Sequence, residues 1–297
     1  MENSIMRLIT DSVKERLGDG YKITTQDVTK NNGLVLKGLT IKHGTENICP
    51  TIYLNSFVDD YLNNVPLEKI VEHIIHIYQE HKSDYYDISY FCCFEKIKGK
   101  IIYQLINTDK NKDLLKEIPS ISYLDLSIIF KVIVDSPNAT GISTITINNS
   151  YLEMWNVTVT DIHLLAKENT PRLMPAKIKN IFNIMQELCP GNMKEIFSFD
   201  NALPMYVLTN TNCVNGSCCI LYPNVLANFA DAVDSDIYVL PSSVHETILL
   251  TGIPNHLDTS YLKQMVSEVN TTEVSDEEIL SDSVYLFSKE THTLSQI

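Results

Sequence analysis

The sequence predicts an α+β fold with mixed or antiparallel sheets and flanking helices. Three observations predict it. First, β-rich stretches near the N-terminus are separated by turn signals such as Asn31-Asn32-Gly33. Second, the C-terminal third follows the order strand, strand, helix, strand, strand, which indicates a sheet backed by one helix. Third, the 297 residues are 44% hydrophobic and 20% charged, so the chain is long and apolar enough to bury a full core.

The N-terminal part begins with an amphipathic helix over residues 4–17, which ends before Gly18. A hairpin or meander follows, with strands over residues 21–28, 33–42 and 48–54. A further helix is indicated over residues 65–81, because Asn64 can cap it, Pro66 stands in its first turn and its apolar residues share one face.

In the middle of the chain we expect a helix over 87–98, a strand over 100–106 and paired buried strands over 125–134 and 142–147. Thr158 and Asp161 indicate the start of a helix that runs through Lys167. A second helix is expected over residues 176–188.

The C-terminal third contains the ββαββ unit, with elements expected over residues 205–209, 217–222, 223–233, 236–240 and 246–251. Two helices follow, over residues 257–269 and 276–280, and residues 283–288 are expected to return as an edge strand. The sequence divides into an N-terminal α+β region over residues 1–120 and a C-terminal one over residues 121–297, which could also form one continuous domain.

Charge is distributed unevenly along the chain. The formal net charge is −14, and residues 195–297 contain 14 acidic but only 2 basic residues, whereas residues 1–194 contain 23 acidic and 21 basic residues. Nucleic-acid binders need clustered cations to displace counterions from phosphates, and this chain has only three arginines. The sequence therefore predicts no direct binding to nucleic acid and, for the same reason, none to an anionic membrane surface.

Neither the N-terminus nor the cysteines indicate export. Residues 1–4 do not lead from a cationic stretch into an apolar run, and no apolar stretch approaches the roughly 20 residues that cross a bilayer. The seven cysteines are an odd number and include two vicinal pairs, which fits a reducing compartment. We therefore expect a cytoplasmic protein.

The segment Ser242-Ser243-Val244-His245-Glu246 places hydroxyls, an imidazole and a carboxylate close together after a predicted strand. A hydrolytic triad assembles such groups by tertiary contact, whereas a strand-loop-strand run points alternate side chains to opposite faces. The Gly-x-Ser-x-Gly elbow that exposes a nucleophile is absent. The sequence therefore favours a turn capped by serine hydroxyls over a catalytic site.

Several asparagines allow two interpretations. Asn107, Asn111, Asn169 and Asn210 stand at the ends of predicted elements, where an amide can close a turn or cap a terminus. The same residues could instead line a polar pocket with Arg172.

No metal site and no cofactor is predicted. His73 and His76 share a helix with two glutamates, but their spacing is not that of His-Glu-x-x-His. Cys213 and the pair Cys218-Cys219 lack a CxxC partner, so we expect these cysteines to be buried small hydrophobes. The chain also has no phosphate-binding glycine loop of the P-loop or Rossmann kind.

Four segments of the chain together carry a family resemblance. They are Asn47-Ile48-Cys49-Pro50-Thr51-Ile52-Tyr53-Leu54-Asn55, Asn169-Thr170-Pro171-Arg172-Leu173, Met205-Tyr206-Val207-Leu208-Thr209-Asn210 and Leu240-Pro241-Ser242-Ser243-Val244-His245-Glu246. Over nearly its whole length the chain resembles an uncharacterised domain family of gut Firmicutes whose members are often carried on mobile elements. The resemblance implies no reaction, cofactor or catalytic residue.

Two functional hypotheses follow. The first is a non-enzymatic cytosolic binding protein whose acidic C-terminal surface engages a basic protein partner, which on a mobile element suggests an inhibitor of a host protein. Because 14 acids among these residues are an ordinary density, a merely solvated surface is the plainer alternative. The second is a small-molecule hydrolase centred on Ser243, His245 and Glu246. We assign no catalytic residue, and the candidate binding residues are Asn169, Arg172, Asn210, Ser242, Ser243, His245 and Glu246.

Overall fold

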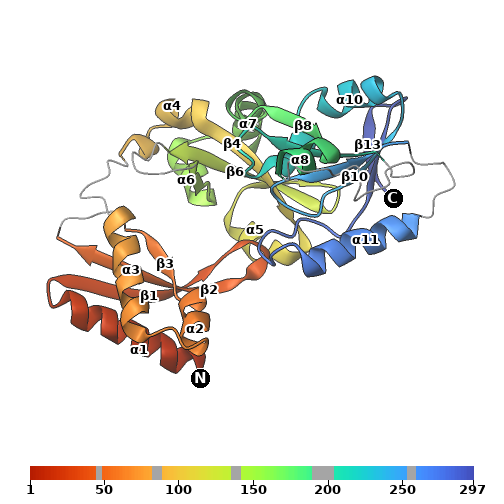
Figure 1. The fold of residues 1–297 in the computed structure, drawn as a ribbon. Coiled ribbons are helices and arrows are strands. Elements are labelled where there is room, and N and C mark those ends of the chain that lie inside the picture. The colour runs from red at the N-terminus through yellow and green to blue at the C-terminus, as the bar shows by residue number, and fades with distance from the viewer. Residues whose placement is uncertain (45–48, 82–88, 135–141, 189–203, 253–258) are drawn as a thin grey trace. The chain divides into compact units, whose positions relative to one another are not determined.

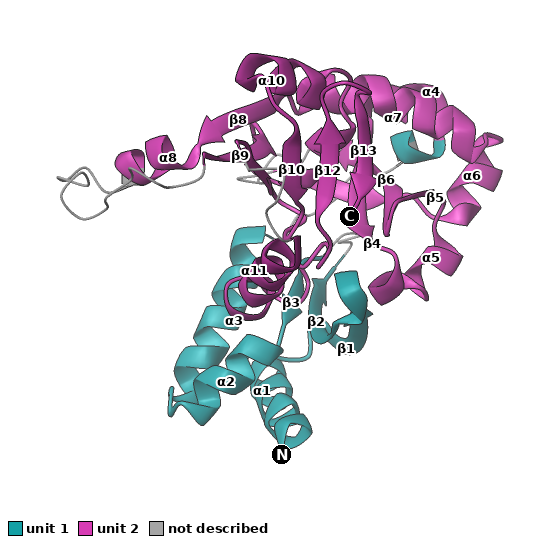
Figure 2. Ribbon diagram, turned by 90° about the vertical axis from the view of Figure 1, so that its right-hand side faces the viewer, with its two compact units in different colours: residues 1–92 teal, residues 93–297 magenta. Residues whose placement is uncertain are grey.

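The structure is a computed structural model that describes residues 1–44, 49–81, 89–134, 142–188, 204–252 and 259–297 (Figure 1). It divides into two compact units, unit 1 over Met1–Cys92 and unit 2 over Cys93–Ile297 (Figure 2). The sequence predicts a boundary at residue 120 and leaves open one continuous domain. Residues 93–120 lie in unit 2 because the strand that they contain pairs with a strand that begins at Leu126.

In unit 1 a three-stranded antiparallel sheet, in the order β1-β2-β3, packs against helices. Its elements are α1 (Glu2–Leu17), β1 (Tyr21–Thr29), β2 (Val35–His43), β3 (Thr51–Tyr53), α2 (Asn55–Leu62) and α3 (Leu67–His81). Helices and strands both contribute to the buried core, which includes Ile9, Leu39, Ile41, Leu54 and Ile74. The predicted first helix, the meander and the helix over 65–81 are confirmed, whereas α2 was not predicted.

The first sheet of unit 2 is antiparallel and has β6 paired with β4, β5 and β7. The elements of this part are α4 (Phe94–Ile97), β4 (Ile101–Asn107), α5 (Leu114–Glu117), β5 (Ser120–Tyr123), β6 (Leu126–Val134), β7 (Ser143–Thr146), α6 (Asn149–Trp155) and α7 (Val159–Leu173). The pairing of β6 with β7 confirms the predicted strand pair, but only β6 is mostly buried, whereas the residues of β7 are partly exposed.

The predicted start of α7 is also confirmed. The Thr158 hydroxyl accepts a hydrogen bond from the Asp161 amide at 3.3 Å, and the Asp161 carboxylate accepts one from the Thr158 amide at 2.8 Å. This reciprocal capping box satisfies backbone donors that the first turn of a helix leaves unpaired.

The second sheet of unit 2 has six antiparallel strands in the order β13-β12-β10-β11-β9-β8. The elements of this part are β8 (Ala176–Asn180), α8 (Ile181–Leu188), β9 (Met205–Asn210), α10 (Val225–Val233), β10 (Ile237–Leu240), β11 (Thr247–Leu250), α11 (Thr259–Thr272), β12 (Tyr285–Ser288) and β13 (Thr293–Gln296). These pairings make the fold α+β with antiparallel sheets, as the sequence predicts.

Two predicted elements of this sheet region are wrong in type. The segment 176–188 is not one helix, because Ala176 to Asn180 pair with β9 and the helix begins only at Ile181. The predicted strand over 217–222 is a 3-10 helix, Gly216–Leu221, whose residues are mostly buried. The ββαββ unit therefore lacks its second strand.

Two further elements near the C-terminus differ. The predicted helix over 276–280 is a turn, and its Ile279 forms an isolated bridge with Ser243. The strand expected at the sheet edge is β12, but it lies between β10 and β13.

The helix expected over 87–98 forms only short helical turns where it is described. No described helix is long and apolar enough to cross a membrane.

Candidate functional site

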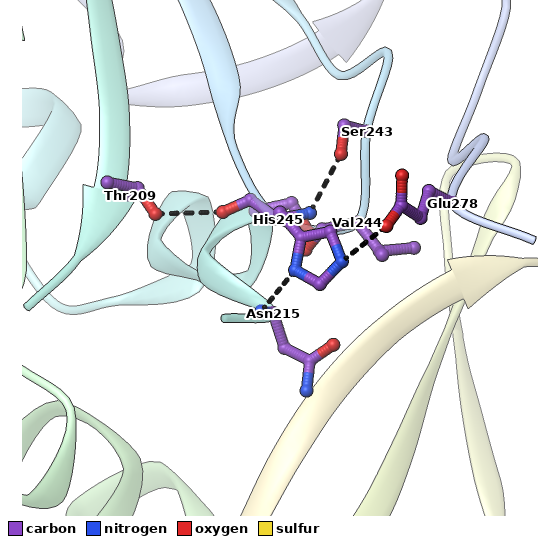
Figure 3. A network of polar contacts seen from close by, with 7 residues as sticks. Thr209, Asn215, Ser243, Val244, His245 and Glu278 are labelled. Atoms are coloured by element: carbon purple, nitrogen blue, oxygen red, sulfur yellow. Dashed lines mark hydrogen bonds and ion pairs between the residues drawn. The ribbon is translucent and has the colours of Figure 1, made fainter. Parts of the chain in front are cut away.

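The segment 242–246 connects β10 to β11 and is held mainly by its backbone (Figure 3). The Ser243 hydroxyl accepts a hydrogen bond from the His245 amide at 3.0 Å, and the Ser242 carbonyl accepts one from the Leu280 amide at 2.9 Å. Both serines are buried, whereas Glu246 is exposed. The Ser243 hydroxyl thus closes a turn, the arrangement that such residues favour in loops.

Both ring nitrogens of His245 have partners other than a serine. Nδ1 accepts a hydrogen bond from the Asn215 amide at 3.2 Å, and Nε2 lies 3.2 Å from the Glu278 carboxylate. Because Nδ1 accepts, the proton of the neutral ring is on Nε2, which donates to Glu278. A general base needs a free nitrogen within hydrogen-bond reach of the nucleophile, so this geometry does not activate Ser243.

The backbone around His245 ties three segments together. The His245 carbonyl accepts hydrogen bonds from the Thr209 hydroxyl at 2.8 Å and from the Gly216 amide at 2.9 Å. The Val244 carbonyl accepts one from the Ser217 hydroxyl at 2.8 Å. Since buried carbonyls need such partners, the end of β9, the 3-10 helix and the β10–β11 connection are stabilised as one body.

Asn210 closes the loop that leads into this body. Its side-chain oxygen accepts a hydrogen bond from the Asn212 amide at 2.9 Å, and its side-chain nitrogen donates to the Val214 carbonyl at 2.7 Å. A buried asparagine used in this way replaces backbone partners that the loop lacks.

Asn169 and Arg172 contact a different part of unit 2, the turn before β4. The Asn169 amide donates to the carbonyls of Lys98 at 2.8 Å and Ile101 at 3.1 Å. Arg172 donates to the Gly99 carbonyl and to the Asn169 side-chain oxygen, both at 2.9 Å. The structure therefore joins these two residues with each other, while the contacts of Ser243 and His245 described above involve other segments.

A polar cluster that the sequence did not indicate surrounds Asp125, in the turn between β5 and β6. Its carboxylate accepts hydrogen bonds from the hydroxyls of Ser281 at 2.6 Å, Ser283 at 3.0 Å and Tyr285. Burial, and next the Asp125 carboxylate, raise the pKa of Tyr285. The partners are 156 to 160 positions apart in sequence, so no local motif could predict the cluster.

The cysteines and histidines in the described part of the chain do not assemble a metal centre. Cys218 and Cys219 are buried, as predicted, but Cys213 is exposed. A hydrogen bond with Cys219 and burial raise the pKa of the Cys218 thiol well above its ordinary value, which keeps it protonated. His76 pairs with Glu80 at 3.3 Å, and the described residues contain no group of three or more candidate metal ligands.

Carboxylates gather at the C-terminal end of α11 and in the turn that follows. We call residues 268–282 the acidic segment, and it contains no lysine or arginine. Its carboxylates belong to Glu268, Glu273, Asp276, Glu277, Glu278 and Asp282. The last turn of α11 also contains no basic residue that would offset the negative end of the helix dipole.

The acidic segment is anchored to the rest of unit 2 by side-chain contacts. Glu278 lies against His245, and the Asn270 amide donates to the Asp282 carboxylate at 2.6 Å. The Glu278 side chain is 41% exposed and that of His245 29%, so the carboxylate stays accessible while the imidazole orients it. The acidic segment therefore presents a group of negative charges in fixed positions at the surface.

A second acidic region of unit 2 is concave. A cavity of ≈ 700 Å³ is lined by Asp234, Ser235, Asp236, Tyr238, Gly252, Leu286, Lys289 and Glu290. Lys289 lies 2.5 Å from the Asp234 carboxylate and lowers the pKa of that group. The charges of this pair offset each other. The remaining negative charge of the lining comes from Asp236 and Glu290.

A family model described as a family of unknown function (DUF5688) matches residues 3–289. No curated protein and no solved structure matches the chain.

Proposed function

Because the chain belongs to the DUF5688 family, whose function is unknown, its role must be inferred from its own geometry, and we propose that it is a non-enzymatic binding protein that engages a basic protein partner. The contact surface in this proposal is the acidic segment. The proposal extends to a cytosolic location and, if the chain is carried on a mobile element, to inhibition of a host protein.

The observation that carries the proposal is the negative charge at the end of α11, where neither the last helical turn nor the acidic segment contains a lysine or arginine. Carboxylates at a helix C-terminus are unfavourable, because they add to the negative end of the dipole, and cations are preferred there. In this chain Glu268 lies near the C-terminal end of α11, Glu273 directly follows the helix, and Asp276 comes next. A basic partner would relieve this repulsion, which supports a binding role for charges that cost stability in the free protein.

Aromatic surface next to these charges supports the same role. Tyr261, on α11, is 58% exposed, and Gln264 and Glu268 follow it three and seven residues later. These residues therefore share one face of the helix. Tyrosine is enriched at protein interfaces, and its ring can also hold a lysine or arginine side chain.

The contacts of Ser243 and His245 support the non-enzymatic role over the hydrolase alternative. The hydroxyl closes a turn, and each imidazole nitrogen has another partner. Glu246 is exposed and belongs to none of the hydrogen bonds described above. Loss of hydrolysis on replacement of Ser243, in a chain that remains folded, would favour the alternative.

The test measures binding of a fluorescent oligolysine peptide to the full chain. We expect the affinity to fall steeply when salt is raised from about 0.05 M to about 0.5 M, because screening weakens contacts between exposed charges. The double variant Glu273→Gln/Asp276→Asn should bind roughly fivefold or more weakly, since each exposed ion pair contributes up to about 1 kcal/mol.

The matched control is Asp19→Asn/Glu153→Gln, which changes net charge equally at exposed positions outside the acidic segment. We expect it to reduce binding much less than the first variant. Equal losses for both variants, or binding that is insensitive to salt, would contradict the proposed surface.

A further inference from the structure

The sheet of unit 1 has one face that faces away from the core, and its residues follow from the strand register. Side chains alternate between the two faces of a strand, and directly paired residues point to the same side. Ile23 and Ile41 are paired and belong to the core side. The other side, which we call the open sheet face, consists of Lys22, Thr24, Gln26, Val28, Leu36, Gly38, Thr40, Lys42, Thr51 and Tyr53.

Two lysines stand directly opposite each other on the open sheet face. Lys22 pairs with Lys42 in the register of β1 and β2, and both side chains are exposed. Like charges at directly opposed positions of an antiparallel pair repel and destabilise the sheet. The next pair, Thr24 and Thr40, is uncharged, and its hydroxyls lie 2.6 Å apart.

No carboxylate offsets these lysines among the described residues of the face. Asp27 lies on the core side of β1, where its carboxylate is 2.5 Å from the Lys37 ammonium. A third cation adds to the face, because the Lys30 ammonium lies 4.2 Å from the centre of the Tyr53 ring. The open sheet face is therefore basic, although the chain as a whole carries a net charge of −14.

We propose that the open sheet face binds an acidic polypeptide segment of a partner protein, with the carboxylates placed between Lys22 and Lys42. A carboxylate at this position would offset the repulsion between the two ammonium groups and accept hydrogen bonds from both. The hydroxyls of Thr24 and Thr40 can hydrogen-bond to the same segment as it continues along the strands. This surface lies on unit 1 and has the opposite charge to the acidic segment, so it does not depend on the function proposed above.

A nucleic acid fits the same face less well. Binding of single strands relies on aromatic rings on which bases stack, and the Tyr53 ring is already covered by Lys30. Residues 1–92 contain 13 acidic and 9 basic residues, so a long polyanion would be repelled beyond the small basic face. A short acidic peptide segment needs only the local cluster of charge.

The experiment titrates the full chain with a fluorescent hexaglutamate peptide and, in parallel, with a single-stranded oligonucleotide. Binding of the peptide should weaken about fivefold in Lys42→Gln and more in Lys22→Gln/Lys42→Gln, at the upper end expected for exposed ion pairs. The matched control Lys69→Gln removes an equal charge from the exposed surface of α3 and should leave binding unchanged. Replacing the acidic segment residues Glu273 and Asp276 should also leave it unchanged, which separates this test from that of the proposed function.

A second measurement detects the repulsion itself. In the free protein, Lys42→Gln should slow amide hydrogen exchange in β1 and β2, by up to about fivefold, because it removes the opposed charge. Saturating peptide should slow exchange in the same strands of the unmodified chain. Absence of peptide binding, equal weakening by Lys69→Gln, or preferential binding of the oligonucleotide through Lys22 and Lys42 would each overturn the proposal.

Discussion

Replacing Gly216 with alanine would place a methyl group where unit 2 has no room for one. A Cβ atom at this position would lie 2.2 Å from the Thr209 hydroxyl oxygen, 2.6 Å from the His245 carbonyl oxygen and 2.7 Å from the Asn210 amide nitrogen. Two of these three atoms belong to the backbone, so rotation of a side chain cannot relieve the contact. The β9 strand and the β10–β11 connection would have to move apart.

The expected cost has two parts. Overpacking a buried position typically costs 1–3 kcal/mol, here taken as about 2 kcal/mol. Separation of the segments also weakens the two hydrogen bonds that the His245 carbonyl accepts, each contributing about 1 kcal/mol. We therefore expect Gly216→Ala to lower the free energy of unfolding of unit 2 by roughly 3–4 kcal/mol.

The assay is urea denaturation followed by the fluorescence of Trp155, the single tryptophan of the chain. It lies in α6 of unit 2 with its side chain 7% exposed, so its emission reports unfolding of that unit. With a slope of about 2 kcal/mol per molar urea, the midpoint should fall by roughly 1.5–2 M.

Gly99→Ala is the matched control, because nothing lies within 4 Å of a Cβ built at that exposed glycine. It should change the free energy of unfolding by no more than about 0.5 kcal/mol. Adding Thr209→Ala to Gly216→Ala should restore little stability, since the two backbone contacts remain. Unfolding of Gly216→Ala at the same urea concentration as Gly99→Ala would show that the surroundings of Gly216 have room for a methyl group.

Two other predictions concern buried hydrogen bonds of unit 2. Burial and Asp125 raise the pKa of Tyr285, so this group stabilises the fold below the ordinary tyrosine pKa of about 10, and the contribution is lost as pH rises above it. Tyr285→Phe should therefore lower the free energy of unfolding by about 1–3 kcal/mol at neutral pH. It should also reduce the loss of stability at alkaline pH, measured by urea titrations at several pH values. An alkaline loss equal to that of the unmodified chain would contradict this role of Tyr285. Asn169→Ala should cost about 2–3 kcal/mol, because it removes the hydrogen bonds that Asn169 donates to the Lys98 and Ile101 carbonyls. Asn149→Ala, which removes one exposed bond to the Lys116 carbonyl, should cost less than about 1 kcal/mol. Equal midpoints for the two asparagine variants would contradict the role given to Asn169.

Local periodicity predicted the elements in which one face is apolar. The buried residues Ile70, Val71, Ile74 and Tyr78 of α3 recur at helical spacing, and the pattern predicted that helix almost to its ends. Thr158 and Asp161 likewise marked the first turn of α7, because a capping box depends only on residues three positions apart.

The misassigned elements are those in which tertiary contacts override local preference. Residues 176–180 alternate between apolar and polar types over a stretch too short to separate strand from helix, and pairing with β9 decides in favour of a strand. Residues 217–222 have high strand propensity, yet they form a 3-10 helix where the Ser217 amide and hydroxyl both donate to the Val244 carbonyl.

For the candidate sites, too, the sequence identified individual residues but not their tertiary contacts. Ser243, His245 and Asn210 were identified from the sequence, but their partners Glu278, Asn215 and Gly216 were not. Nothing in the spacing of residues indicates that an imidazole will meet a glutamate 33 positions later. The signal that could have drawn attention to Gly216 is its place after Asn215 in a turn, which predicts a glycine without predicting what approaches it.

The amino-acid sequence by itself determined the α+β class, the main amphipathic elements and the concentration of negative charge in residues 195–297. These properties depend on composition and on spacing within a few residues, which the chain carries in any conformation. Only the tertiary structure decided that Glu278 lies against His245, that Asp125 accepts hydrogen bonds from three hydroxyls, and that Lys22 stands opposite Lys42. The reason is that such pairs form when strands and turns distant in sequence pack together, and their register is set by the burial of the whole sheet rather than by neighbouring residues.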